Sequence, residues 1–553
     1  MTIPDPPRGY RGELRTDDDA RAVYAEAAGI GRALPRAVAR PADVESVSTI
    51  VAWAAAQGLP VIPRGSGSSM SGGAIGDGLI LDLGALDDIG PVDAGRRSVR
   101  VGAGAIRDRV DAVARAAGLR FPVDPSSGAF CTIGGMIGTN AAGARSLAFG
   151  AMRTSVLALD CVFADGSCAE VRRGVSWTDV PALRTFAAEY RSGLEELARR
   201  GTLAHVDVRK ESSGYRVADF LASGDIVDLI VGSEGTLCVV VGAELALREL
   251  PGATSTVLAA FPSLDDAVAA ATQAAAHDAT ACELLDRTFL DVARSGGHAH
   301  GIPEGSDAVL LTEVEGAGVR EARARAERIA DVFRHAGASV AVTAVEPMAE
   351  AELWEVRHAA SPTIARLHPE LRSMQFIEDG AVPPARFALY VRGVRDALAR
   401  HGLRGVIFGH AGDAHAHVNP LVDVTAPAWR DTIAALLADV TDLVAHLGGT
   451  IAAEHGDGRL RTPLLPKVWP QESLEAFRAI KHAIDPRGVL NPGVKVPIAG
   501  QQPLEQIKYD PALPALPARA AVVLRQVERE RAYARSRLEL LDLAEGPRLA
   551  AGD

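Results

Sequence analysis

Residues 63–76 constrain this chain more than any other stretch, because they are rich in glycine and serine and lie between two apolar runs. The sequence Pro-Arg-Gly-Ser-Gly-Ser-Ser-Met-Ser-Gly-Gly-Ala-Ile-Gly follows Leu59–Ile62 and precedes Leu79–Leu83. Glycine permits positive φ, so such a turn can aim successive N–H groups into one concavity that suits an anion. A flexible linker has a similar composition, so this stretch alone leaves both interpretations open. The spacing matches neither the Rossmann nor the P-loop fingerprint.

Two further segments share this character. Residues 122–143 contain Pro-Ser-Ser and then Cys-Thr-Ile-Gly-Gly-Met-Ile-Gly-Thr-Asn-Ala-Ala-Gly, and residues 231–237 read Val-Gly-Ser-Glu-Gly-Thr-Leu. The first could lie flat along a long polar ligand, or form a close-packed small-residue helix over Gly134–Ala142. Three such segments predict one extended ligand rather than a single compact phosphate site.

Composition excludes several functional classes. The 553 residues are 48% hydrophobic and 23% charged, with a formal net charge of −12, which argues against general nucleic-acid binding. No apolar run reaches the roughly 18 residues needed to span a membrane, and residues 1–15 lack the apolar core of a signal peptide. We therefore expect a cytoplasmic protein, with peripheral attachment at the inner membrane face left open. The five cysteines include no Cys-x-x-Cys, so buried free thiols are expected rather than a cysteine-held cluster.

The three motifs together resemble the flavin-binding segments of the vanillyl-alcohol-oxidase-type (PCMH-type) FAD-linked oxidoreductases. Within that family they are similar to the D-lactate, glycolate and D-2-hydroxyglutarate dehydrogenase branch, over about residues 10 to 497. The resemblance implies an α+β fold, with a two-subdomain FAD-binding domain and a cap domain. Alternating strand and helix patterns after residue 250 suit an α+β cap with an antiparallel sheet. The expected divisions are a helical segment 1–34, the FAD-binding domain 35–250, the cap 251–485, a return segment 486–497, and a Pro-rich linker with a C-terminal helix 498–553. Helices are expected over residues 16–29, from Val44 until Gly58 ends the apolar periodicity, and over residues 518–543.

The resemblance also implies which residues contact FAD. The pyrophosphate would lie on the first loop, the ribityl chain and flavin on the second segment, and the adenosine end near the third. Since the first loop holds no His or Cys, we expect non-covalent FAD. Cys238 replaces a glycine usual in the family. The implied residues are Arg64, Gly65, Ser66, Gly67, Ser68, Ser69, Gly72, Pro122, Ser127, Thr132, Gly134, Gly135, Gly138, Asn140, Gly143, Glu234, Gly235, Thr236 and Asn491.

A helix predicted over residues 354–367 carries Arg357. From pattern alone an arginine there is most simply a surface charge. The family uses an arginine in this Trp-x-x-Arg context to bind a substrate carboxylate, which a guanidinium can pair bidentately. Relatives that act on dicarboxylates have a second basic residue where this chain has Ile377, which favours a monocarboxylate.

The densest set of chemical side chains is Gly409–Pro420, where three histidines and Asp413 fall within eight residues. His410, His417 and the distant Glu454 are the predicted ligands of a divalent metal, Zn²⁺ or Mn²⁺. His410 needs a turn at Gly412 to join the others. The family motif has Gly at Ala414 and Asn at His415, so His415 is a fourth or alternative ligand. Asp413 and Asn419 are expected to orient the imidazoles.

The resemblance, together with these residues, implies an FAD- and metal-dependent dehydrogenase that oxidises a D-2-hydroxy acid, with D-lactate first and glycolate or D-2-hydroxyglutarate as alternatives. Arg357 would hold the carboxylate, and His455 would accept the hydroxyl proton. An electron-relay flavoprotein subunit and a sugar or alcohol oxidase are the alternatives of other kinds. Electrons would pass to a separate quinone, cytochrome, flavoprotein or iron–sulfur protein. A homodimer is left open. The tail after Pro497 either packs on its own domain or docks an acceptor or second subunit.

Overall fold

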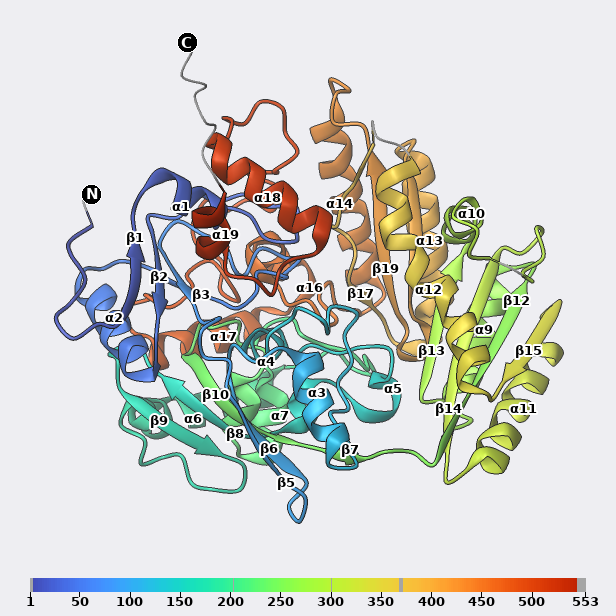
Figure 1. The fold of residues 1–553 in the computed structure, drawn as a ribbon, viewed down its shortest axis with the longest axis horizontal. Helices are drawn as coiled ribbons and strands as arrows, with labels where there is room; N and C mark the ends of the chain where they lie inside the picture. The colour runs from blue at the N-terminus through green and yellow to red at the C-terminus, as the bar shows by residue number, and fades with distance from the viewer. Residues whose placement is uncertain (1–2, 202, 300, 368–370, 545–553) are drawn as a thin grey trace, which may run out of the picture.

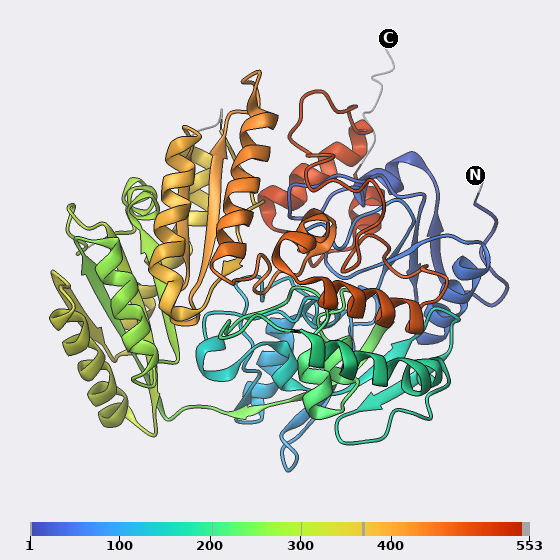
Figure 2. The same cartoon turned by 180° about the vertical axis from the view of Figure 1, so that it is seen from behind.

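The computed structural model describes residues 3–201, 203–299, 301–367 and 371–544. Residues up to β11 (Arg248–Glu249) and from α15 (Gly458–Arg461) onward form one half of the molecule, and the residues between them form the other (Figures 1 and 2). None of the helices in these ranges is long and apolar enough to cross a membrane. The five cysteines are free; Cys168 is exposed and the other four are buried, so the expectation of buried thiols fails at that one position.

The first sheet positions the Gly/Ser loop. Its strand order is β1-β2-β4-β3, and β4 pairs in parallel with both β2 and β3. The loop leaves β3 at its carboxyl end, where ligands of parallel sheets commonly bind. The Asp43 side chain caps α2 by accepting from Ser46 N, as the apolar periodicity from residue 44 predicts. The bounds are β1 Gly12–Arg15, β2 Ala37–Pro41, α2 Val44–Ala56, β3 Val61–Arg64 and β4 Leu79–Asp82.

The second sheet is antiparallel, with strand order β5-β6-β10-β8-β9. Helix α4 (Ile133–Thr139) packs beside it, capped by Thr132 and ended by Asn140 in the left-handed conformation. The small-residue helix left open by the sequence is therefore present, but it is shorter than Gly134–Ala142. A side chain at Gly134 would lie 2.8 Å from Ala103, so this position requires glycine. The other bounds are β5 Ile89–Asp93, β6 Ser98–Gly102, α3 Arg107–Ala116, β8 Val156–Val162, β9 Cys168–Arg172 and β10 Val239–Ala246.

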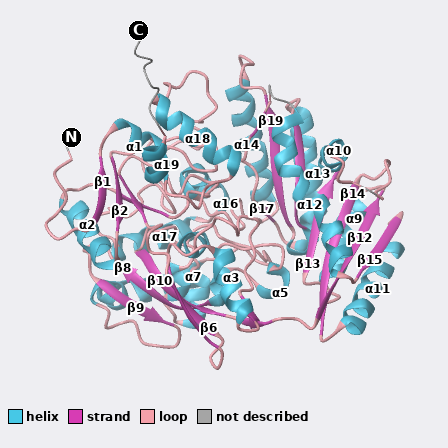
Figure 3. Cartoon of the chain, viewed as in Figure 1, coloured by secondary structure: helices cyan, strands magenta, loops and turns pink. Residues whose placement is uncertain are grey.

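The middle of the chain forms an α+β unit around a third sheet, with strand order β15-β12-β14-β13-β18-β19-β16 and every pairing in that order antiparallel. This confirms the predicted α+β cap. Helices α9, α11, α13 and α14 bury one face of this sheet, and α10 and α12 cover the other (Figures 1 and 3). The strands are β12 Ala253–Phe261, β13 Ala281–Asp286, β14 Ala308–Gly316, β15 Val340–Ala344, β16 Arg372–Ser373, β18 Arg404–His410 and β19 His415–Val422. The helices are α9 Leu264–Ala275, α10 Arg287–Ser295, α11 Val319–His335, α12 Pro347–Leu367, α13 Phe387–Arg400 and α14 Trp429–His446.

The chain then returns to the FAD-binding half. Helix α17 (Gln471–Ile484) packs there, with Phe477 edge-on to Tyr215 at 5.7 Å. The boundaries of the domains stay a prediction. The remaining helices and short strands are β7 Leu119–Arg120, α5 Ser146–Phe149, α6 Arg191–Arg200, α7 Val217–Ser223, α8 Val227–Ile230, β11 Arg248–Glu249, β17 Gly380–Ala381, α15 Gly458–Arg461 and α16 Leu465–Val468.

Two helices differ from the sequence pattern. The N-terminal helix α1 covers only Asp18–Val23 instead of residues 16–29, because the carbonyls of Tyr24 and Glu26 accept hydrogen bonds from Arg64. The single helix expected over residues 518–543 is two helices, α18 (Ala518–Glu530) and α19 (Arg537–Leu543), since Arg531 is left-handed and Ser536 caps the second. Both helices pack against α1, so the C-terminal tail is packed on the N-terminal part of the same chain.

Candidate functional site

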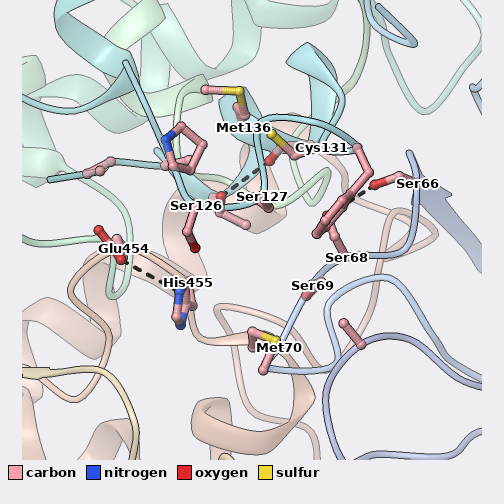
Figure 4. A pocket seen from close by; sticks show the side chains of 18 of the residues that line it. Ser66, Ser68, Ser69, Met70, Ser126, Ser127, Cys131, Met136, Glu454 and His455 are labelled. Atoms are coloured by element: carbon pink, nitrogen blue, oxygen red, sulfur yellow. Dashed lines mark hydrogen bonds and ion pairs between the residues drawn. The ribbon is translucent and has the colours of Figure 1, made fainter. Parts of the chain in front are cut away.

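A cavity of about 1090 Å³ lies between the FAD-binding half and the cap. All three glycine-rich segments line it, and so do the cap residues that carry the predicted chemistry. Figure 4 shows residues of the first two segments across the cavity from Glu454 and His455. Of the residues implied for FAD, the cavity wall includes Arg64, Gly65, Ser66, Gly67, Ser68, Ser69, Ser127, Thr132, Gly134, Gly135, Gly138, Gly143, Glu234 and Gly235. Of the residues implied for chemistry, it includes Arg357, His410, His417, Glu454 and His455.

The Gly/Ser loop turns its carbonyls away and leaves its amides available. The carbonyls of Gly67 and Ser69 accept from Ala28 N and Gly29 N at 3.0 and 3.1 Å. Within the described ranges, the N–H groups of residues 65–69 donate to no protein group. The Ser69 hydroxyl is buried and also lacks a partner. Unpaired donors around a cavity are what a bound anion would satisfy, so the loop fits a phosphate-bearing ligand.

Arg64 supports this loop through hydrogen bonds to backbone carbonyls. Its side chain is buried, and its guanidinium donates to the carbonyls of Tyr24, Glu26 and Ala74 at 3.0 to 3.2 Å. Burial lowers the pKa of this guanidinium. The side chain therefore shapes the turn; that Arg64 also helps to hold the pyrophosphate, as the resemblance implies, stays a prediction. Gly67 has φ of +73° and a Cβ there would lie 2.3 Å from Arg64, so the turn requires glycine.

Five of the implied residues do not line the cavity: Gly72, Pro122, Asn140, Thr236 and Asn491. Asn491 donates to the carbonyls of Gly73 and Glu234 at 3.0 and 2.8 Å, which ties the first and third segments together. Asn140 accepts from Arg153 N at 2.9 Å at the end of α4. These side chains hold the lining segments in position.

The histidine motif forms a hairpin at the edge of the cavity. Strand β18 ends at His410, a short turn covers Ala411–Asp413, and β19 begins at His415. The predicted turn at Gly412 is thus present. Ala414 adopts φ of +55°, a conformation that favours the glycine of the resembled family motif. One possible ligand atom from each of His410, His415, His417 and Glu454 lies within 4.8 Å of the others.

His410 and His417 converge on one carboxylate. Their Nε2 atoms lie 3.4 and 3.3 Å from Glu454 Oε1. The Nδ1 atoms are held from behind, by Glu283 and by the Glu378 carbonyl respectively. Metal-binding histidines are typically oriented in this way, so this donor set fits a divalent cation.

His415 differs from its neighbours. Its Nε2 lies 3.0 Å from Asp379 Oδ1, and its buried Nδ1 has no partner. Burial and the nearby His417 lower the pKa of His415 to about 3, so the ring stays neutral. A neutral, unpaired nitrogen keeps open its role as a further ligand.

Sequence reasoning missed several partners of the site. Glu283 lies opposite His410 in the β13–β18 pair, and its second oxygen accepts from Arg357 Nε at 2.9 Å. Lys210 is buried and donates to Glu454 Oε2 at 2.7 Å. No motif spacing links these residues to the histidines. The expectation that Asp413 orients an imidazole is wrong, because its carboxylate accepts from Ser146 Oγ at 2.6 Å.

His455 stands beside the cluster with its ring stacked on His417 at 5.2 Å. Its Nδ1 lies 3.1 Å from Glu378 Oε1, and its Nε2 lies 3.7 Å from Glu454 Oε1. Burial alone would lower the pKa of His455, but the carboxylates of Asp379 and Glu378 outweigh it and raise the pKa to about 9. Among the predicted catalytic groups, Arg357 also lies at the cavity, with its guanidinium 4.8 Å from the Phe408 ring.

Comparison with known proteins agrees with this geometry. Residues 35–172 match the model of the FAD binding domain, and residues 250–494 match that of the FAD linked oxidases, C-terminal domain. The chain is 31% identical over 468 residues to glycolate oxidase subunit GlcD of Bacillus subtilis, covering 84% of this chain and 89% of that protein. The chain belongs to the FAD-linked oxidase family.

Two further relatives support this assignment. D-lactate dehydrogenase of Archaeoglobus fulgidus is 30% identical over 461 residues, covering 82% of this chain and 90% of that protein. The solved structure of 4-ethylphenol oxidase from Gulosibacter chungangensis superposes with a TM-score of 0.64 at 16% identity, covering 89% of this chain and 94% of that one. The latter likeness confirms the predicted vanillyl-alcohol-oxidase-type fold of this FAD-linked oxidase.

Proposed function

We propose that this FAD-linked oxidase is a metal-dependent dehydrogenase of a D-2-hydroxy acid, with D-lactate as the favoured substrate. The observation that carries the proposal is one cavity that joins an anion-binding turn to Arg357 and to the convergent His410, His417 and Glu454. A sugar or alcohol oxidase would need neither the carboxylate clamp nor the metal ligands.

Different side chains of the chain would bind the substrate carboxylate, accept the hydroxyl proton and hold the metal. Glu283 uses the Nε edge of Arg357, so a substrate carboxylate would pair with the Nη nitrogens of the fork. His455 would accept the hydroxyl proton through Nε2 while Glu378 holds Nδ1. FAD would supply the two-electron oxidant, and Zn²⁺ or Mn²⁺ on His410, His417 and Glu454 would supply Lewis-acid polarisation.

The favoured substrate is proposed from the residue type at position 377. Ile377 is buried in the apolar core of the cap and does not line the cavity, whereas members of the resembled family that act on dicarboxylates have a basic residue at this position. A second carboxylate would therefore lack this partner. This supports D-lactate over D-2-hydroxyglutarate, with glycolate as the smaller alternative.

Anaerobic titration tests the proposal. The purified yellow holoenzyme is mixed with D- and L-lactate, glycolate and D-2-hydroxyglutarate, and bleaching of the flavin absorbance is recorded. D-lactate is expected to bleach it fastest, and L-lactate is expected to leave it oxidised. Failure of every 2-hydroxy acid to bleach the flavin would favour an electron-relay subunit instead.

We also propose that the flavin is non-covalent and that a separate acceptor reoxidises it. Residues 65–69 offer no nucleophilic side chain of the His or Cys type for a covalent link. Acid precipitation should therefore leave a colourless pellet and a yellow supernatant. A yellow pellet would contradict non-covalent binding.

A further inference from the structure

The C-terminal extension, residues 498–544, lies beyond both regions that match the family models, yet it forms part of the cavity wall. The matches to the two family models cover residues 35–172 and 250–494. Four residues of the extension line the cavity together with the glycine-rich segments: Tyr509, Glu528, Arg531 and Tyr533. The extension is therefore in a position to contact whatever fills the cavity.

The extension is attached to both halves of the molecule. On the FAD-binding half, α18 and α19 share one buried cluster with α1, and Arg519 Nη1 lies 3.3 Å from Asp19 Oδ2. On the cap, Arg430 of α14 donates to Asp510 at 3.0 Å, and Ile507 is buried in the cap cluster. In Figures 1 and 2 the segment lies between the N-terminal sheet and α14. It is a fixed part of the structure rather than a loose tail.

The C-terminal extension contacts two of the glycine-rich segments that line the cavity. The Tyr533 ring lies 5.3 Å from the Phe130 ring, which belongs to the second glycine-rich segment. The Arg531 guanidinium lies 5.3 Å from the centre of the same Phe130 ring. Arg537 is buried beneath Tyr533 and donates to Ser66 O at 3.3 Å. That bond holds a carbonyl of the Gly/Ser loop away from the cavity, which keeps the loop amides facing inward.

We propose that the C-terminal extension is part of the flavin site, where Tyr533 and Arg537 act as positioning residues that slow the release of FAD. The inference rests on the proposed FAD dependence. Tyr533 closes the wall against Phe130, and Arg537 fixes the loop that the cofactor phosphates would occupy. A ligand leaving past this wall must separate an aromatic pair, whose interaction is of the order that changes a rate about tenfold.

The test measures FAD release from the full-length holoenzyme. Flavin fluorescence, which rises when FAD leaves the protein, is followed after dilution of wild type and of Tyr533→Ala, Tyr533→Phe and Arg537→Lys. Tyr10→Ala is the matched control, since Tyr10 is a partly buried tyrosine of the FAD-binding half that does not line the cavity. The unfolding temperature of each protein is measured in parallel.

We expect release about tenfold faster from Tyr533→Ala, and faster release from Arg537→Lys because lysine lacks the fork that bridges Ser66 O and the Tyr533 ring. Tyr533→Phe and Tyr10→Ala should release FAD at the wild-type rate. Wild-type release from Tyr533→Ala would overturn the inference, as would equally fast release from the Tyr10→Ala control. A wild-type protein that never carries FAD would instead refute the proposed function, so the two failures are distinguishable. If Tyr533→Ala does not fold, Arg537→Lys decides: wild-type release from it would overturn the inference.

Discussion

Glu283 should control both the proposed metal site and the proposed substrate clamp. One carboxylate oxygen accepts from His410 Nδ1, and the other accepts from Arg357 Nε at 2.9 Å. The side chain is 1% exposed, so neither contact is shared with bulk water. Burial alone would raise the pKa of this carboxyl, but His410 and Arg357 outweigh it and hold the pKa far below its usual range. Glu283→Gln keeps the size of the side chain and removes its charge.

The magnitude follows from the two contacts. A glutamine amide has one accepting oxygen, so it can satisfy only one of the two donors and turns its NH₂ toward the other. A hydrogen bond to a charged group contributes about 1.5–3 kcal/mol, and loss of an outer partner of a metal ligand typically weakens metal binding about 10–100-fold. If the glutamine loses the contact with His410, we expect metal affinity to fall by about 10–100-fold. If it loses the contact with Arg357, we expect KM for the 2-hydroxy acid to rise by a similar factor. If the loss is shared between the two contacts, both quantities should change by less.

The assay separates these outcomes. Competition with a chromophoric chelator gives the metal affinity, and dye-linked turnover at saturating metal gives KM. Glu315→Gln is the control, because Glu315 forms a comparable two-point pair with Arg120 at 2.6 and 2.7 Å on the adjacent strand and does not line the cavity. Wild-type metal affinity together with wild-type KM in Glu283→Gln would refute the reasoning.

Other expectations address the remaining parts of the site. His455→Ala should retain FAD and metal but lose flavin reduction by substrate in stopped-flow absorbance; wild-type reduction would exclude it as the base. Because the carboxylates raise the pKa of His455 to about 9, the group is protonated below that pH, so turnover should rise as pH increases toward 9. Glu378→Gln should lower that pKa and move the rising limb to lower pH; an unmoved limb would assign it to another group. A chelator should abolish turnover reversibly, and less than one equivalent of metal in active enzyme would contradict the metal's role. Gly67→Ala should weaken FAD binding, measured by fluorescence titration, since its Cβ would lie 2.3 Å from Arg64; unchanged affinity would show that the turn tolerates a side chain.

The sequence could identify groups that lie within one motif. His410 and His417 share a hairpin, and Glu454 and His455 are adjacent, so short spacing shows their association. The partners that orient them come from elsewhere. Glu283 reaches His410 only because β13 pairs with β18 in one particular register, and Lys210 reaches Glu454 across 244 residues of chain. Local periodicity cannot specify such pairings, because many registers bury the same apolar face.

Helix bounds were likewise predicted well only where the residues that end the helix are close to it in sequence. The apolar spacing from residue 44 predicted α2 closely, since its cap and its buried face are both local. The N-terminal helix was predicted too long, because the signal that ends it is Arg64, which takes carbonyls just after α1. The C-terminal pattern was helical but interrupted at Arg531, where the backbone is left-handed.

From the sequence alone, the resemblance of the three glycine-rich segments to a known family predicted the cofactor class and the α+β architecture. The metal site and the carboxylate clamp were predicted from residue types together with that resemblance, and both stay predictions. Such a resemblance is recognisable because the glycines and the histidines of each motif lie at short spacing along the chain. Only the tertiary structure decided that Arg64 supports the Gly/Ser loop through buried hydrogen bonds, that Glu283 joins Arg357 to His410, and that the C-terminal extension lines the cavity. The physical reason is that each of these depends on buried polar groups finding partners, and those partners come from whichever segment the packed core places nearby.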